Sequence, residues 1–459
     1  MTGERCDLLV DDGRILTMDA ARTVHERGAI AVRAGTIVAV GDRDELRQRY
    51  DAERTIDASG AIVHPGFVDA HYHATIHATR DMLPDSGPPA GGNARSGASF
   101  GLFARWFEAI EGEDEHASAL LACAEMARNG VTCFMDPGTT LEPDAVAEAV
   151  EAVGIRASLA DPFLWDVEGG LTLASEIPRA PADRKRALGL LGGQLRRNDD
   201  PDALVRGHVA VYGSGSASEE LERAASDCAA ANGAVLTQHQ NLDPADGAFD
   251  RDRFGRDGLV HLAEIGVLGE HCTFMHMNVL TDAERDAVVE SGMSLSWHPG
   301  NFLFYGISRY GPSPAPGLHR RGTNVAIGSD VAKAWAFGDM GWLGYLVARM
   351  NGEPFGPDDV LTLNTVAGAK AVGMGSRIGS LEVGKRADLV IREREAPESW
   401  PGIQPEQNAA LISRTRGVAT VVVDGRVVVE RGRLANADEE MIYAHARESA
   451  QRMMQRVGL

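Results

Sequence analysis

Cysteine is scarce in this sequence, and no two cysteines stand at the C-x-x-C spacing of thiol redox or zinc motifs. The 459 residues include five cysteines, an odd number spread from position 6 to position 272. Small domains held by disulfides need denser pairs, so we expect reduced thiols in a cytoplasmic protein. The first residues also lack the basic region and apolar core of a secretory signal.

Basic residues and long apolar runs are also under-represented. Lys and Arg number 45 against 66 Asp and Glu, which gives a net charge of −21. Such a charge disfavours nucleic acid and anionic membrane surfaces as partners. No uninterrupted apolar run reaches the ~20 residues of a membrane helix. We therefore expect a small-molecule ligand and no membrane.

Both ends of the chain have β character. Short β-rich runs alternate with turns over residues 7–62, and similar runs return at 384–391 and in a hairpin around Asp424-Gly425. We predict a small β-sandwich domain built from residues 1–64 and 377–435. Residues 436–459 are expected to form a closing helix.

The middle of the chain alternates strands with helices. Strands are predicted at 67–70, 131–135, 156–160, 205–212, 234–237, 272–275, 293–297 and 324–327. This alternation predicts an α/β protein with a (β/α)₈ TIM barrel over residues 65–376. The Gly/Pro/Ser-rich stretch 84–99 is expected to be a long loop over the end of the first strand.

Histidines follow the first predicted barrel strand at an alternate spacing. Because residues two apart in a strand share one face, His71 and His73 can direct both imidazoles at one point. Two converging imidazoles supply half of a metal site. An isolated H-x-H is more often a pair of unconnected surface histidines, so the rest of the chain has to supply further ligands.

Other predicted strands also end in residues that bind metals, namely His239, His276, His298 and Asp330. Barrel enzymes carry their catalytic residues at these strand ends. We predict one divalent ion held by His71, His73, His239 and Asp330, with a position left open. Nitrogen and oxygen ligands suit zinc first, and also iron, cobalt or manganese.

Catalytic roles are predicted for three of these residues. The ion would lower the pKa of water from about 15.7 to roughly 7, and Asp330 would take that proton and pass it to the leaving group. His276 is placed either to bond a developing oxyanion or to be a further ligand. His298 either orients Asp330, contacts substrate or is structural.

These residues resemble the amidohydrolase superfamily. The resemblance rests on the run from His64 to His73, the strand ends at His239 and His276, Gly328-Ser329-Asp330, and the run from Ile378 to Val390. The nearest-looking division contains triazine hydrolases and guanine and cytosine deaminases. The resemblance implies a metal-dependent hydrolase that acts on carbon–nitrogen bonds other than peptide bonds, with the four ligands already named.

Two departures from that pattern shape the functional expectation. Many binuclear members carry a carboxylated lysine after the fourth strand, where this chain has Tyr212-Gly213-Ser214, so a mononuclear site is expected. Deaminases and triazine hydrolases usually carry His-x-x-Glu on the fifth strand, whereas this chain has His239-Gln240-Asn241-Leu242. The missing acid removes the obvious means of protonating a heteroaromatic ring.

The preferred substrate is therefore a small, largely apolar amide, urea or (thio)carbamate, cleaved at a C–N or C–S bond. In this respect the chain is similar to phenylurea and molinate hydrolases. The alternative is an aminohydrolase, deaminase or dechlorinase of a nitrogen heterocycle, with Gln240, Asn241 or His276 replacing the acid. A metal-free scaffold is a third hypothesis, which the intact ligand set disfavours.

Substrate contacts are predicted from side chains that follow the same strands. The candidates are Phe163, Trp165, Gln240, Asn301, Phe304 and Trp335. The competing interpretation of each aromatic residue is ordinary packing at the rim of the barrel. A homo-oligomer is expected by analogy with other barrels of this size.

Overall fold

Eight parallel strands form the barrel at the centre of the computed structural model, which describes residues 3–82, 98–168, 177–331 and 334–459. The strands are β6 (Phe67–Asp69), β7 (Val131–Met135), β8 (Arg156–Leu159), β9 (Val205–Gly207), β10 (Val209–Gly213), β11 (Leu236–Gln240), β12 (Cys272–His276), β13 (Ser294–Trp297) and β14 (Asn324–Ile327). β9 and β10 are two parts of one strand, separated only by His208.

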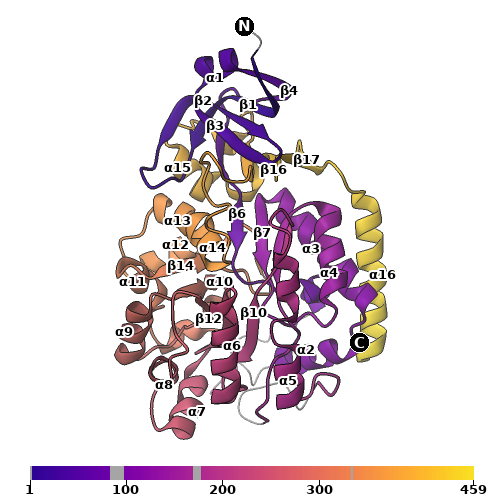
Figure 1. The fold of residues 1–459 in the computed structure, drawn as a ribbon, viewed down its shortest axis with the longest axis vertical. Helices are drawn as coiled ribbons and strands as arrows, with labels where there is room; N and C mark the ends of the chain where they lie inside the picture. Colours follow the sequence, from indigo (N-terminus) through magenta and orange to yellow (C-terminus); the bar gives the residue numbers. More distant parts are fainter. Residues whose placement is uncertain (1–2, 83–97, 169–176, 332–333) are drawn as a thin grey trace.

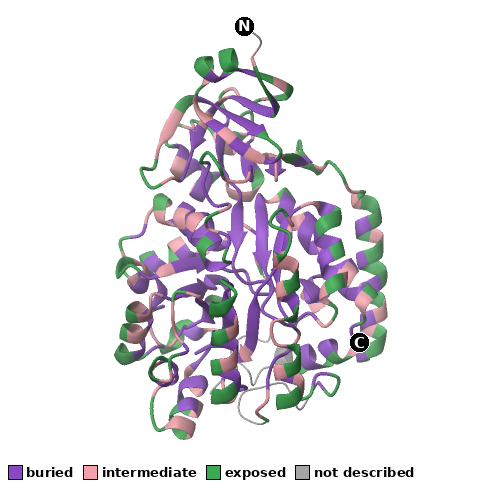
Figure 2. Cartoon of the chain, in the orientation of Figure 1, coloured by how far each residue is buried: buried purple, intermediate pink, exposed green. Residues whose placement is uncertain are grey.

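The barrel closes where β14 meets β6. The amide of Ala70 donates to the carbonyl of Ile327 at 2.8 Å, and the amide of Asp330 donates to that of His71 at 2.8 Å. The strands are almost wholly buried (Figure 2). Such strands, buried on both sides, explain the continuous apolar runs in the sequence. The predicted TIM barrel is confirmed.

Helices surround this barrel and connect its strands. Their bounds are η1 (Ala74–Met82), α2 (Ala98–Ala109), α3 (Gly112–Arg128), α4 (Pro143–Val153), α5 (Arg184–Leu190), α6 (Glu219–Ala231), α7 (Pro244–Phe254), α8 (Gly258–Glu264), α9 (Asp282–Ser291), α10 (Pro299–Phe304), α11 (Ala315–Arg320), α12 (Met340–Met350), α13 (Pro357–Asn364) and α14 (Val366–Ala371). The loop expected at 84–99 lies almost entirely outside the described residues.

Strands from both chain ends form the second domain, as predicted. They are β1 (Glu4–Leu16), β2 (Val24–Arg33), β3 (Thr36–Asp42), β4 (Tyr50–Asp57), β5 (Ile62–Pro65), β15 (Leu389–Arg392), β16 (Val418–Val423), β17 (Arg426–Glu430) and β18 (Arg433–Leu434), with helix α1 (Arg43–Arg49). Hydrogen bonds join all of them into one nine-stranded sheet. The two ends meet where β5 pairs antiparallel with β15.

Charged side chains hold the two domains and the last helix together. At the amino end of β8, buried Arg156 donates to Asp388 at 2.7 Å and to Asp424 at 2.7 Å. Helix α16 (Glu439–Val457) returns along the barrel, where buried Asp114 of α3 accepts hydrogen bonds from Ser449 and Arg452. The β-sheet domain therefore covers the amino ends of the strands, and the carboxyl ends face away from it (Figure 1).

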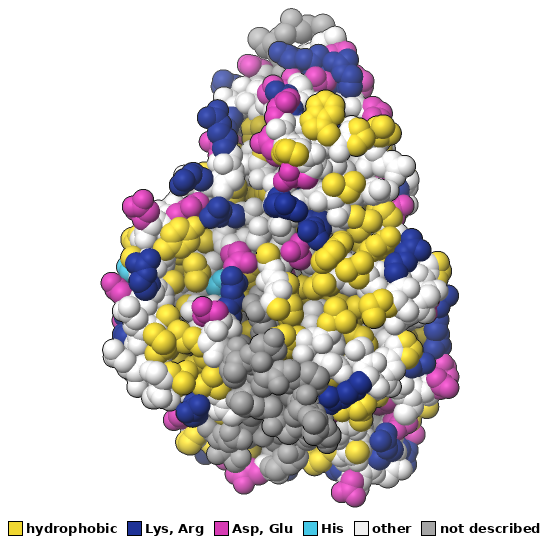
Figure 3. Space-filling model, turned by 180° about the vertical axis from the view of Figure 1, so that it is seen from behind, with side chains coloured by type: hydrophobic (Ala, Val, Ile, Leu, Met, Phe, Trp, Pro, Cys, Tyr) yellow, Lys and Arg dark blue, Asp and Glu magenta, His cyan; other side chains and the backbone are white. Residues whose placement is uncertain are grey.

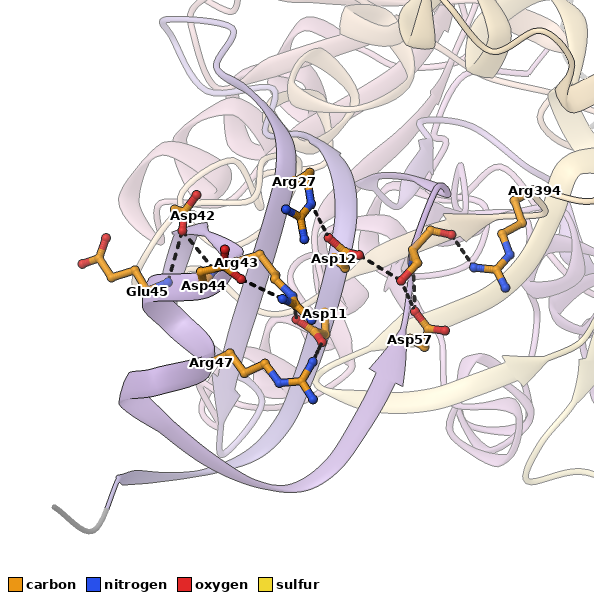
Figure 4. Close-up of polar contacts among 11 residues, drawn as sticks. Asp11, Asp12, Arg27, Asp42, Arg43, Asp44, Glu45, Arg47, Asp57 and Arg394 are labelled. Carbon is orange, nitrogen blue, oxygen red and sulfur yellow. Dashed lines mark hydrogen bonds and ion pairs between the residues drawn. The ribbon is translucent and has the colours of Figure 1, made fainter.

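The surface carries charges of both signs. On the face seen in Figure 3, acidic and basic side chains are interspersed among apolar ones. A cluster of ion pairs lies on the β-sheet domain, where Asp11 accepts from Arg43 and Arg47 (Figure 4). Among the described helices, none has the length and apolar character that crossing a membrane requires.

Candidate active site

Four predicted ligands converge at the carboxyl ends of β6, β11 and β14. His71 Nε2 lies 3.8 Å and His73 Nε2 lies 3.2 Å from Asp330 Oδ1. The rings of His71 and His239 are 5.0 Å apart, and nitrogen atoms of His71, His73 and His239 lie within 4.8 Å of one another. The structure thus brings together side chains more than 250 residues apart in the sequence.

The outer ring nitrogens of two ligands are already engaged. His73 Nδ1 shares a hydrogen bond with Thr139 Oγ1 at 2.7 Å. His239 Nδ1 lies 2.9 Å from the carbonyl of Tyr212, which can only accept, so Nδ1 carries the proton. The bond to the carbonyl fixes the tautomer of His239 and leaves its Nε2 to act as a ligand, and both bonds hold the rings in place.

His276 and His298 lie beside this group. Their Nδ1 atoms are 2.9 Å apart, and His298 stacks on His71 with ring centres separated by 4.5 Å. His276, His298, His71 and Asp330 offer a second set of ligand atoms within 4.8 Å of one another. Burial holds the pKa values of His239, His276 and His298 well below the ordinary value, so these imidazoles are neutral.

Asp330 is held by its backbone and by an amide side chain. Its φ of +57° is uncommon outside glycine, and the bond from its amide to His71 helps to keep it there. Asn301 Nδ2 donates to Asp330 Oδ2. The other carboxylate oxygen is the one that faces the ligand histidines.

Asp69, which the sequence reasoning missed, ties the two ligand-bearing strands together. Its Oδ1 accepts from the amide of His71 at 3.2 Å and from that of Ser329 at 3.0 Å. Burial raises its pKa to about 7. An aspartate within the apolar run that precedes His71 was the sequence feature that could have pointed to this residue.

The donor chemistry of the cluster fits a divalent metal. It consists of buried imidazoles and one carboxylate, and hydrogen bonds to neighbouring groups orient several of them. These are the ligands that zinc and other divalent transition metals prefer. His71, His73, His239 and Asp330 would hold the ion, and His276 is near enough to join them.

A cavity opens onto the cluster. Its volume, including the open mouth, is about 580 Å³. The lining residues beside the metal-site residues are Ile76, Phe103, Phe107, Thr139, Tyr212, Leu242, Tyr305 and Val331. The described walls are therefore mainly aliphatic and aromatic. Phe103 and Phe107 are one turn apart on α2.

The six predicted substrate contacts lie outside the described lining of this cavity. Phe163 and Trp165 pack against Tyr212 from behind, with ring centres 6.2 and 4.9 Å away. Phe304 and Trp335 contact each other, with ring centres 6.5 Å apart. In these cases, the aromatic residues after the strand ends pack at the rim of the barrel.

The two polar candidates are displaced for different reasons. Gln240 follows His239 in the strand, so alternation turns its side chain outward, where it bonds Asp250 at 2.9 Å. Asn301 reaches the site but bonds Asp330. The walls that reasoning missed come from η1, α2 and the loops, and their sequences carry no distinctive motif.

Comparison with known proteins agrees with this geometry. A model of the amidohydrolase family matches residues 62–428, which is most of the chain, and an imidazolonepropionase-like composite domain of bacteria matches residues 28–52. The 5-methylthioadenosine/S-adenosylhomocysteine deaminase of Syntrophobacter fumaroxidans is 31% identical over 464 residues, spanning 96% of this chain and 97% of its own. This chain belongs to the amidohydrolase family.

Solved structures of zinc-bound enzymes share the fold. An adenosine deaminase from Xanthomonas campestris with bound zinc has a TM-score of 0.87 and 24% identity, covering 99% of this chain and 100% of its own. An atrazine chlorohydrolase from Arthrobacter aurescens TC1 complexed with zinc has a TM-score of 0.84 and 22% identity, covering 96% and 100%. With the family match and the 31% identical deaminase, this amidohydrolase is a metal-dependent hydrolase of carbon–nitrogen bonds.

Proposed function

We propose that this amidohydrolase uses one zinc ion to remove an amino group from a ring carbon of a nitrogen heterocycle by hydrolysis. The observation that carries the proposal is the 31% identity, over nearly the full length of both chains, with a deaminase of 5-methylthioadenosine and S-adenosylhomocysteine. This identity overturns the preference for amides and ureas that the sequence suggested. It supports the alternative, a deaminase of a nitrogen heterocycle.

The residues of the cluster have distinct proposed roles. His71, His73, His239 and Asp330 hold the ion. When bound, the ion supplies Lewis acidity and makes water a stronger acid. Asp330, oriented by Asn301, accepts a proton from water and delivers it to the departing amine.

The ring nitrogen still needs a proton donor. Leu242 lies in the cavity wall, three residues after His239, where deaminases of this superfamily usually have glutamate. His276 also lines the cavity, and its contact with His298 leaves its second ring nitrogen to face the substrate. We assign to His276 the role of donating a hydrogen bond to the ring nitrogen of the substrate.

Leu242 also supports a second candidate function. An acyl carbon in an amide, urea or carbamate needs no ring protonation, and an aliphatic wall at this position suits an apolar acyl substrate. Hydrolysis of such a C–N bond is therefore the competing proposal.

A substrate panel with one matched variant separates the two proposals. The zinc-loaded protein is assayed against 5-methylthioadenosine, aminopurines and aminotriazines, and against anilides, phenylureas and carbamates. Ring deamination with ammonia release is the expected result. Leu242→Glu should then raise kcat on the ring substrate about tenfold or more, because general acids contribute at least that much. Leu242→Gln controls for polarity alone.

Acyl cleavage without ammonia release from any ring would overturn the first proposal. In that case Leu242→Glu should lower activity, because a carboxylate placed in an apolar wall repels an apolar substrate.

A further inference from the structure

A buried chain of polar side chains lies on the outer face of β11, directly behind His239. Gln238 and Gln240 flank His239 in the strand and point the opposite way, toward the surrounding helices. There they meet Glu222 of α6 and Asp250 of α7. All four side chains are buried, and the most exposed, Glu222, is only 7% accessible.

The contacts of this chain are continuous. Gln240 Nε2 donates to Asp250 Oδ2 at 2.9 Å, and Gln238 Nε2 donates to Gln240 Oε1 at 3.2 Å. One terminal atom of the Gln238 amide lies 2.9 Å from Glu222 Oε2; it is the nitrogen if Glu222 is ionised and the oxygen if Glu222 is protonated, and the orientation of Gln240 decides between the two. Three contacts thus link the Asp250 carboxyl, the two amides and the Glu222 carboxyl in a row. The nitrogen of each amide can donate, whereas its oxygen can only accept. Two donors cannot make three hydrogen bonds, so the chain needs one more proton.

A side branch determines where that proton resides. Gln240 Nε2 also donates to Asn241 Oδ1 at 2.8 Å, and Asn241 Nδ2 donates to the backbone carbonyl of Val279 at 3.0 Å. A backbone carbonyl only accepts, so the orientation of Asn241 is fixed, and with it those of Gln240 and Gln238. The oxygen of Gln238 is therefore left facing Glu222, and only a protonated carboxyl can donate to it.

We propose that Glu222 is a positioning residue, which keeps its proton in the folded protein and donates it in a hydrogen bond to Gln238. The completed chain ties the outer face of β11 to α6 and α7, and so holds His239 at its place among the ligands. The inference shares with the proposed function only the assignment of His239 as a ligand, and it depends on no particular substrate.

The surroundings favour a neutral Glu222. The charged and titratable groups around it are Asp166, Glu219, Asp250, Arg253, His261 and Cys272. The pKa of Glu222 is raised to about 8, mainly by burial and also by the charges of Asp250 and Asp166, against the opposing effect of Arg253. Burial raises the pKa of Asp250 only to about 6, so this carboxyl ionises first and accepts from Gln240.

Gly258 leaves room for the other end of the chain. A Cβ at this position would lie 2.0 Å from Asp250 Oδ2 and 3.0 Å from Gln240 Nε2. Any larger residue must displace the carboxyl or the amide. Gly258→Ala therefore disturbs the same chain without changing any charge.

The first experiment locates the proton. Unfolding of wild type and Glu222→Gln is followed between pH 5 and pH 9, with Glu220→Gln on the exposed side of α6 as control. Between the ordinary pKa of 4.5 and about 8, unfolded wild type releases a proton that the folded protein keeps, so wild-type stability falls with pH. The folding constant of Glu222→Gln relative to wild type should rise toward tenfold per pH unit and level off near pH 8. A ratio that stays flat, as expected for Glu220→Gln, means that Glu222 is ionised when folded, and overturns the proposal.

The second experiment tests positioning by zinc titration of the metal-free protein at pH 7. Glu222→Gln keeps a donor toward Gln238 and should bind zinc as wild type does. Glu222→Leu removes the donor and should bind about 10- to 100-fold more weakly, as losses of residues behind metal ligands typically do. If Glu222→Leu fails to fold, Gly258→Ala takes its place with the same expectation. Wild-type zinc affinity in the folded variant would overturn the positioning role, whatever the substrate panel shows.

Discussion

The two strands β6 and β11 supply three of the proposed ligands, and each is supported from outside by a buried polar network. Behind β6, Tyr72 turns away from its ligand neighbours and bonds His77, whose Nε2 lies 3.3 Å from Glu125. Behind β11, Gln238 meets Glu222. In both places a carboxyl ends a chain that starts next to a metal ligand.

The two networks differ in the groups that contact the carboxyl. Arg80 Nη1 lies 2.6 Å from Glu125 Oε2, whereas Glu222 forms no ion pair with the described residues. Burial alone would raise the pKa of Glu125, but the bond from His77 and the charge of Arg80 lower it below its ordinary value. Glu125 is partly exposed and contacts His77 and Arg80, whereas Glu222 is buried beside acidic neighbours, so the surroundings favour an ionised carboxyl in the first network and a protonated one in the second.

Removing a ligand should have the largest effect on zinc affinity. It also distinguishes a residue on the inner face of β11 from one on the outer face. His239→Ala should weaken zinc binding more than about a hundredfold, exceeding the loss expected for the outer residues. Zinc titration measures this directly. His25→Ala, in the β-sheet domain, is the control and should bind as wild type. An equal loss of zinc affinity in His239→Ala and Glu222→Leu would contradict the different roles proposed for the inner and outer faces of β11.

Removing the metal should affect both networks at once, because the ligands share it. Chelation should abolish hydrolysis and lower the melting temperature, and added zinc should restore both. A ligand present at about 100 times its Kd contributes roughly 2.7 kcal/mol to the free energy of unfolding. Calorimetry with and without zinc measures the shift, and an unchanged melting temperature would contradict a site that forms only in the folded chain.

Alternation along strands made the inner face predictable. The spacing of His71 and His73, and the single histidine His239, were enough to place imidazoles at one end of a barrel. The same rule places Gln240 on the outer face, so its assignment to substrate came from proximity in sequence alone. Applied consistently, alternation would have found the network behind β11.

The cavity wall could not be predicted in this way. Phe103 and Phe107 lie on α2, and α2 packs in one apolar cluster with Met453 and Val457 of the last helix. That contact joins segments about 350 residues apart and leaves no periodic pattern in either. Which side chains face a substrate was therefore decided by tertiary packing and not by local sequence.

Exchanging Glu125 for glutamine should give the opposite pH dependence to Glu222→Gln. The folded pKa of Glu125 is lowered, so its contribution is present above 4.5 and is lost as the pH falls through the folded pKa. Glu125→Gln should be less stable than wild type by about 1–2 kcal/mol at pH 7, since the pair is partly exposed, and the gap should narrow toward pH 3. Denaturant unfolding across this range measures it. A gap that widened on acidification would contradict the assignment of charge.

The smallest effect is expected for an ion pair whose cation lies in solvent. Asp11 accepts from Arg47 at 2.9 Å on the β-sheet domain; the arginine side chain is 59% exposed, although that of the aspartate is only 9% exposed (Figure 4). Pairs with a solvent-exposed partner contribute about 1 kcal/mol or less, and salt screens them. Arg47→Ala should therefore change the free energy of unfolding by less than about 1 kcal/mol, and less again in 1 M salt. Urea unfolding at two salt concentrations measures it, with Arg43 still paired to Asp11 in the variant. A larger, salt-independent loss would mean that charge pairing, and not burial, sets the strength of the networks behind β6 and β11.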